Sequence, residues 1–189
     1  MDSAAHQWGV EGYREYLRLL VRLQLGTFLR AKLDASDIVQ QVMLHAHENR
    51  TQFRGISEAE WLGWLRAILA NTLAATARRF DTQSREATRE RSLEAELDLS
   101  SARLENLLAA DQSSPSERVV HVEEILQLAG ALAQLPDDQR RVVELHHLRG
   151  LKVADVATEM DRTRPAVVGL LFRGLKRLRE ILREGEGTA

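Results

Sequence analysis

Residues 135–182 constrain the fold of this chain most, because they predict three successive helices of which the last two form a helix-turn-helix. Pro136 suits a first helical turn, where its missing N–H leaves no hydrogen bond unmade. Gly150 ends this first helix, because glycine adopts the left-handed cap conformation without steric cost. A tight turn at residues 161–163 separates the second helix from the third. The apolar face of the second helix is formed by Val153, Val156, Ala157 and Met160. This arrangement presents a helix to the major groove of DNA.

The third helix has an apolar side and a basic side. Spacings of three and four predict a buried face made of Val168, Leu171, Leu175, Leu178 and Leu182. The opposite side carries Ala166, Gly169, Leu170, Arg173, Lys176 and Arg177. From Arg162 to Arg179 there are six Arg and Lys residues and no Asp or Glu. An ordinary amphipathic helix with a solvated basic face is the alternative, but the preceding helix and turn favour a phosphate-binding surface.

The composition favours a helical protein with only local basic patches. The chain has 189 residues, 3 prolines, 11 glycines and a formal net charge of −2. The absence of cysteine excludes disulfides and thiolate metal sites and is compatible with a reducing cytoplasm. No basic N-terminal region precedes an apolar run, and no apolar run approaches the roughly 20 residues that cross a bilayer. We therefore expect a cytoplasmic, all-α protein without membrane insertion.

The pattern divides the chain into two helical domains, at residues 10–80 and 118–184, joined by a charged linker at 81–117. The linker has a short amphipathic stretch at 93–108, which has too few apolar residues for a core of its own. In the first domain, Tyr13, Tyr16, Leu17, Leu20 and Leu23 predict one amphipathic helix. A second helix begins near Ala35, since Ser36 and Asp37 favour a helix start.

A loop at residues 53–57 precedes a third helix at 58–79. Its predicted inner side consists of Trp61, Leu65, Ile68, Leu69, Thr72 and Thr76. Its predicted outer side consists of Gly63, Arg66, Ala67, Ala70, Asn71, Ala74 and Arg78. Arg and Asn side chains donate hydrogen bonds to phosphates and base edges. The alternative is an Ala-rich helix packed against another helix of the same chain.

In this order the motifs resemble the extracytoplasmic-function group of bacterial RNA polymerase sigma factors, within the sigma-70 family. The first domain matches at Asp34, Ala35, Asp37, Val39, Gln40, Phe53, Arg54, Gly55, Trp64, Leu65, Ile68, Asn71, Arg78 and Arg79. The second matches at Leu135, Pro136, Arg140 or Arg141, Val143, Gly150, Leu151, Val156, Ala157, Arg173, Arg177, Leu178, Arg179 and Glu180. Each motif is weak alone, and their joint order carries the resemblance.

The resemblance implies two partners, core RNA polymerase and promoter DNA, and no cofactor. The polymerase-binding residues would be Asp34, Asp37, Gln40 and Gln41. The minus-ten element, where the duplex melts, would be bound by Ser57, Glu58, Trp64, Arg66, Asn71, Arg78 and Arg79. The minus-thirty-five element would be bound by Arg162, Thr163, Arg164, Ala166, Gly169, Leu170, Arg173, Lys176 and Arg177. We expect Trp61 in the core, while Trp64 points sideways. Members of the group are often held inactive by an anti-sigma protein, which adds a third expected partner.

The chain departs from the group in the predicted recognition helix. The group commonly has Thr, Lys and Arg where this chain has Ala166, Val168 and Leu170, and Gly where it has Asp161. Val168 belongs to the predicted buried face, so its loss of charge is compatible with packing. The remaining surface is poor in hydrogen-bond donors but can contact thymine methyl groups or respond to DNA shape. We expect weaker and less stringent recognition by this helix.

Other functions fit the sequence less well. Six histidines invite a metal site, but His45 and His47 are two apart and His146 and His147 are adjacent, whereas helical ligands come three or four apart. A dimeric helix-turn-helix regulator that binds duplex DNA without polymerase remains an alternative, as does a helical adaptor without DNA. The acidic residues of the linker fit either a nucleic-acid mimic inside polymerase channels or a solvated spacer.

Overall fold

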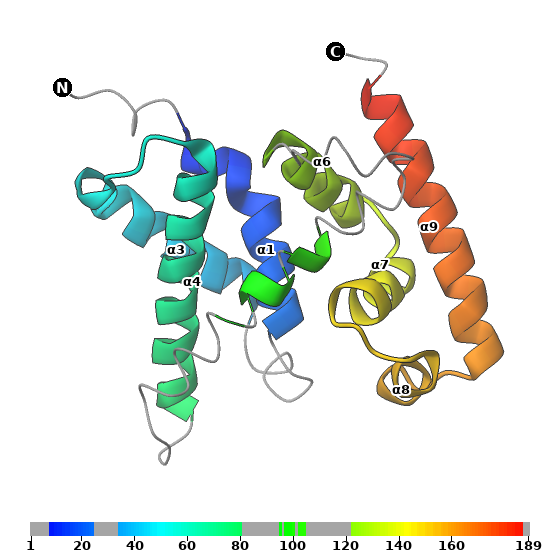
Figure 1. Cartoon of the computed structure of the whole chain (residues 1–189). Helices are drawn as coiled ribbons and strands as arrows, with labels where there is room; N and C mark the ends of the chain where they lie inside the picture. Colours follow the sequence, from blue (N-terminus) through cyan, green and yellow to red (C-terminus); the bar gives the residue numbers. More distant parts are fainter. Residues whose placement is uncertain are drawn as a thin grey trace. The chain divides into compact units, whose positions relative to one another are not determined.

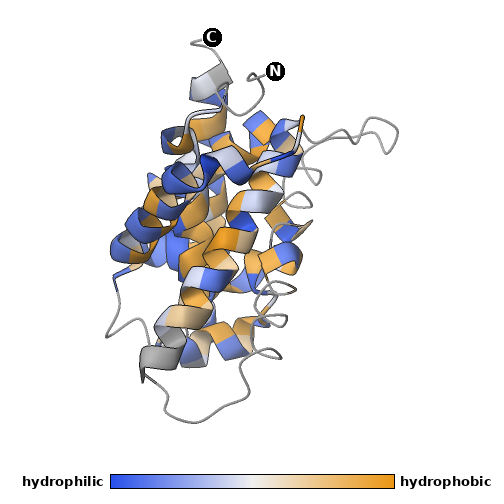
Figure 2. Cartoon of the chain, turned by 90° about the vertical axis from the view of Figure 1, so that its left-hand side faces the viewer, coloured by the Kyte–Doolittle hydropathy of each residue, from blue (hydrophilic) through white to orange (hydrophobic). Residues whose placement is uncertain are grey.

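The structure is a computed structural model, and it describes residues 8–24, 34–80, 95, 97–100, 102–104 and 122–186 (Figure 1). The chain forms two compact units, Met1–Ser101 and Ala102–Ala189. Across the described ranges the secondary structure is helical, without strands, which confirms the all-α prediction. Figure 2 shows hydrophobic and hydrophilic residues alternating along the helices, as expected where one side of each helix is buried.

The first unit is built around α3. A short 3₁₀ turn η1 (Val10–Tyr13) leads into α1 (Arg14–Gln24), and α3 (Ala35–Glu48) packs against both α1 and α4 (Glu58–Phe80). The 3₁₀ turn η2 (Arg50–Gln52) connects α3 to the loop before α4. All the apolar residues predicted for the first helix are buried: Tyr13, Tyr16, Leu17, Leu20 and Leu23.

The α4 helix is buried on more of its circumference than the sequence predicted. Trp61 is fully buried, as expected, but Ala70 and Ala74 are also buried, at 2% exposure each. Their assignment to the outer side was wrong, because small side chains let neighbouring chain pack closely against the helix. The buried Thr72 hydroxyl donates to the Ile68 carbonyl oxygen at 2.9 Å, which satisfies its hydrogen bonding without a tertiary partner.

The described part of the predicted linker carries helical residues and two buried leucines. Leu97, in the first unit, and Leu104, in the second, are 0% and 1% exposed. Arg103 donates to the Leu148 carbonyl oxygen at 3.1 Å. These residues therefore obtain their burial from the units, as a segment without its own core must. The domain borders at 80/81 and 117/118 stay predictions.

In the second unit, the predicted helix after Pro136 is divided in two. After α6 (Val122–Ala133), Pro136 forms the N-cap of α7 (Asp137–Val143), one position before the predicted first turn. The next turn is a π-helix, η3 (Glu144–Leu148). Gly150 ends it with φ +73°, which confirms the predicted left-handed cap.

The helix-turn-helix consists of α8 (Val153–Glu159) and α9 (Arg164–Glu186), joined by a turn in which Asp161 has φ +51°. The buried face of α9 is formed by Val167, Leu171, Gly174, Leu178 and Ile181. The prediction that Val168 is buried was wrong, since it is 54% exposed. The reason is Gly174, where a Cβ would lie 3.2 Å from the Gln139 carbonyl oxygen, so α7 packs on a line that hydrophobic counting overlooks.

Candidate nucleic-acid interface

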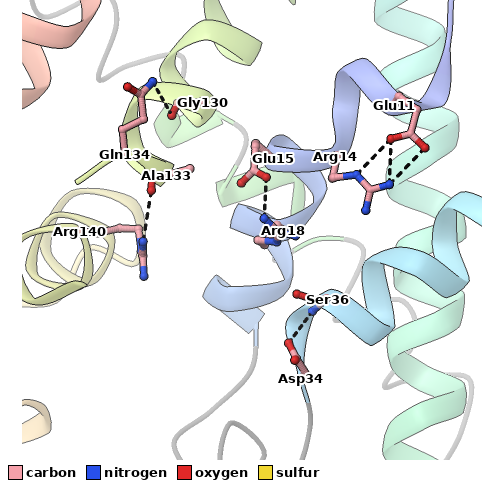
Figure 3. Close-up of polar contacts among 10 residues, drawn as sticks. All are labelled: Glu11, Arg14, Glu15, Arg18, Asp34, Ser36, Gly130, Ala133, Gln134 and Arg140. Carbon is pink, nitrogen blue, oxygen red and sulfur yellow. Dashed lines mark hydrogen bonds and ion pairs between the residues drawn. The ribbon is translucent and has the colours of Figure 1, made fainter. Parts of the chain in front are cut away.

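The exposed side of α3 carries the four residues predicted to bind polymerase. Asp34 is the N-cap, and its carboxylate accepts a hydrogen bond from the Ser36 backbone N–H at 2.8 Å (Figure 3). Asp37, Gln40 and Gln41 are exposed in the first two turns. Leu44 is 55% exposed and lies seven residues after Asp37, on the same side of the helix. Its heptad spacing from Asp37 was a signal that the sequence reasoning missed.

The start of α4 uses two predicted DNA-binding residues for internal contacts. The Ser57 hydroxyl accepts from the Glu60 backbone N–H, and the Glu60 carboxylate accepts from the backbone N–H groups of Ile56 and Ser57, which is a capping box. These donors lower the pKa of Glu60. The Glu58 carboxylate accepts from the Tyr13 hydroxyl at 2.6 Å. Ser57 and Glu58 therefore fix the loop and the helix start.

An aromatic cluster supports the loop. The Phe53 ring centroid lies 5.0 Å from that of Trp61 and 5.6 Å from that of Trp64, and the two tryptophan rings are 4.9 Å apart. The Arg50 guanidinium lies 5.5 Å from the Trp61 ring centroid. Trp64 is only half-buried, so part of its ring faces solvent. Asn71 is exposed seven residues later, on the same side of α4 as Trp64.

Arg66 lies apart from Trp64 and Asn71. It is five residues before Asn71, which separates the two side chains by about 140° around the helix. Its guanidinium donates to the Asp98 carboxylate at 3.1 Å and to the Tyr16 hydroxyl at 3.3 Å, and its side chain is 22% exposed. The side chains of Arg78 and Arg79 lie outside the described residues. The structure therefore groups Trp64 with Asn71 and separates Arg66 from them.

The α9 helix presents most of its predicted DNA-binding residues to solvent. Arg162, Thr163, Arg164, Ala166, Arg173, Lys176 and Arg177 are exposed, whereas Gly169 and Leu170 are half-buried. The Thr163 hydroxyl accepts from the Ala166 backbone N–H at 3.4 Å. Arg162 pairs with Asp138 at 3.4 Å, and Arg177 pairs with Glu180 at 3.2 Å and with Glu184 at 3.6 Å. Arg173 extends along the helix, with its Nη1 3.3 Å from the place a Gly169 Cβ would take.

Two apolar residues on the outer side of α9 were missed as site candidates. Phe172 is 71% exposed and Val168 is 54% exposed. They are four residues apart and therefore adjacent on the helix surface. Exposed Arg164, Arg173 and Lys176 lie on the same helix. The outer side of α9 thus combines positive charge with an exposed apolar pair.

The histidines take structural positions. The His146 Nδ1 lies 2.8 Å from the Leu151 carbonyl oxygen, and burial lowers the pKa of His147, with His146 adding to the effect. No group of metal-binding side chains occurs within the described part of the chain. In that part, too, no helix has the length and hydropathy needed to cross a membrane.

Known proteins resemble this chain over most of its length. Residues 125–178 match the family described as "Sigma-70, region 4". The ECF RNA polymerase sigma factor SigF of Caulobacter vibrioides (strain NA1000 / CB15N) is 31% identical over 180 residues, which are 93% of this chain and 88% of SigF. Among solved structures, the sigma factor RpoE from Bartonella quintana, crystallised with the anti-sigma factor NepR, matches at 18% identity and TM-score 0.35, over 90% of this chain and 91% of RpoE.

The SigF match is long enough and close enough to assign a family, and the region 4 match covers the helix-turn-helix described above. This assignment does not favour the regulator that would act without polymerase, nor an enzyme, since sigma factors are regulatory proteins. The chain belongs to the extracytoplasmic-function (ECF) group of RNA polymerase sigma factors, and its role lies in transcription initiation.

Proposed function

We propose that the chain binds core RNA polymerase through α3 and directs it to promoters through α4 and α9, with melting of the minus-ten element. The observation that carries this proposal is the end-to-end match to SigF, combined with the exposure of both the α3 side and the α9 side. The protein would act in the cytoplasm, where polymerase and DNA are found. An anti-sigma protein remains an expected further partner.

The polymerase contact would combine polar and apolar groups. Asp37, Gln40 and Gln41 offer hydrogen bonds, and Leu44 offers the large exposed hydrophobic side chain that interface centres usually contain. Asp34 caps the helix and would contribute at the rim. We expect Leu44→Ser to weaken core binding more than Gln41→Ala does.

The minus-ten contact would centre on Trp64 and Asn71. The half-exposed ring of Trp64 can stack on an unpaired base, and Asn71 can hydrogen-bond a base edge. Ser57 and Glu58 would act by fixing the loop. Arg66 would reach a phosphate only after leaving Asp98, so we expect it to contribute less than Arg78 and Arg79.

The minus-thirty-five contact would combine phosphate binding with apolar readout. Arg164, Arg173 and Lys176 are exposed and suited to phosphates, with Arg162 and Arg177 contributing less because acidic neighbours already pair with them. Val168 and Phe172 can contact thymine methyl groups in the major groove. This readout replaces the hydrogen-bond donors that the group commonly has at 168 and 170.

Transcription by bacterial core polymerase tests the proposal. Core enzyme is incubated with a pool of genomic fragments, with and without this protein, and the transcript starts are mapped. Starts that occur at defined sites only with the protein would support the proposal, and their aligned upstream sequences would give the promoter consensus. If core stays silent while the protein alone shifts duplex DNA, the regulator alternative is correct and the α3 assignment must be abandoned.

A further inference from the structure

Ile56 is an exposed hydrophobic residue in the loop between η2 and α4. Its side chain is 84% exposed, which exceeds the exposure of Leu44, Leu99, Val168 and Phe172. An isoleucine in this position leaves its apolar surface in water, and that surface gains free energy when a partner covers it. The residue therefore marks a contact site if the loop holds it in a fixed place.

The loop does hold it in a fixed place. The Glu60 carboxylate accepts hydrogen bonds from the Ile56 N–H at 2.8 Å, from the Ser57 N–H at 3.0 Å and from the Ser57 hydroxyl at 3.0 Å. Gly55 sits so close to the Phe53 ring and to Glu60 that a Cβ there would lie 2.8 Å from the Glu60 Cβ. A fixed loop loses little conformational entropy when it binds a ligand.

The neighbours of Ile56 suit a single nucleic-acid strand. Arg54, two residues earlier, is exposed and carries a positive charge. Glu60, which holds the Ile56 N–H, lies on the side of α4 that also presents Trp64 and Asn71. Apolar or aromatic surface for bases, beside a cation for phosphate, is the combination found where proteins bind unpaired strands.

We propose that Ile56 packs against one unpaired base of the melted promoter strand, while Arg54 contacts a neighbouring phosphate. This inference rests on the proposed function and deepens it. The base-holding surface then consists of Ile56, Trp64 and Asn71, with Ser57 and Glu60 as positioning residues that act through the loop. It assigns to Ile56 and Arg54 a contact that the sequence reasoning had given to Ser57 and Glu58.

The test uses holoenzyme assembled from core polymerase and the full-length protein. The probe is a single-stranded DNA oligonucleotide that carries the minus-ten sequence of a promoter mapped as described above. We expect Ile56→Ser to weaken binding of this strand about tenfold, the effect of losing one base contact. Ile56→Val should bind nearly as well as the wild type. Leu99→Ser is the matched control, since Leu99 is 57% exposed and belongs to neither DNA surface.

A scan with abasic sites locates the base. In the wild type, one abasic position should weaken binding strongly, and the same position should have little effect in Ile56→Ser. Equal strand affinity of Ile56→Ser and wild type overturns the inference, as does a loss of core polymerase binding, which would place Ile56 at a protein contact. If wild-type holoenzyme neither initiates at defined sites nor binds the strand, the proposed function itself has failed.

Discussion

The two helices assigned to promoter DNA, α4 and α9, have the same length, 23 residues, but use their polar residues differently. In the α4 region, Ser57, Glu58 and Arg66 contact other residues of the first unit. On α9, Arg164, Arg173 and Lys176 are exposed along a segment without acidic residues. The difference indicates that α4 offers a rigid surface for unpaired bases, whereas α9 offers charge to a duplex. Four predictions test this comparison, in order of decreasing effect.

The largest effect should separate two tryptophans of α4. Trp61→Ala should lower the free energy of unfolding of the first unit by about 3–5 kcal/mol, because it removes a fully buried ring. Trp64→Ala should cost about 1–2 kcal/mol, since Trp64 is half-buried, yet it should weaken single-strand binding. All three tryptophans of the chain lie in the first unit, so fluorescence-detected urea unfolding reports on that unit. Equal losses of stability would contradict the division into a core ring and a contact ring.

The next effect concerns the phosphate contacts of α9. Arg173→Ala should weaken binding to a mapped minus-thirty-five duplex and reduce the slope of log K against log salt by about 0.9, the loss of one phosphate contact. Arg177→Ala should reduce it less, because Glu180 and Glu184 already pair with Arg177. Arg66→Ala is the control from α4 and should leave this slope unchanged. Titrations of holoenzyme at several salt concentrations measure all three, and an unchanged slope for Arg173→Ala removes α9 from the phosphate contacts.

A smaller effect should reveal apolar readout by α9. Replacing thymines of the minus-thirty-five element by deoxyuridine removes only the C5 methyl groups, and it should weaken binding by about 1 kcal/mol where Val168 or Phe172 contacts one. The combined Val168→Ser and Phe172→Ser variant should bind both DNAs equally. A deoxyuridine effect that persists in this variant would assign the methyl contact to Ala166 or Leu170.

The smallest effect concerns the turn before α9. Asp161 has φ +51°, a conformation that glycine adopts without steric cost. Asp161→Gly should therefore stabilise the second unit by about 0.5–1 kcal/mol and leave the salt slope of DNA binding unchanged. Calorimetric unfolding measures the gain. Asp155→Gly, within α8, is the matched control and should destabilise by about 1 kcal/mol.

The sequence by itself determined the all-α class, the Gly150 cap, the burial of Trp61 and the motif order that indicated the family. These features depend on local rules, because helical periodicity, left-handed glycine and motif spacing involve residues near one another in the chain. Tertiary structure decided which faces are buried and which polar groups are already bonded. Gly174 turned the buried face of α9 away from Val168, and Asp98 occupied Arg66 from 32 residues away. Ile56 was exposed because Glu60 and Phe53 fix its loop. Such outcomes depend on close approach between distant segments, which no hydrophobic pattern records.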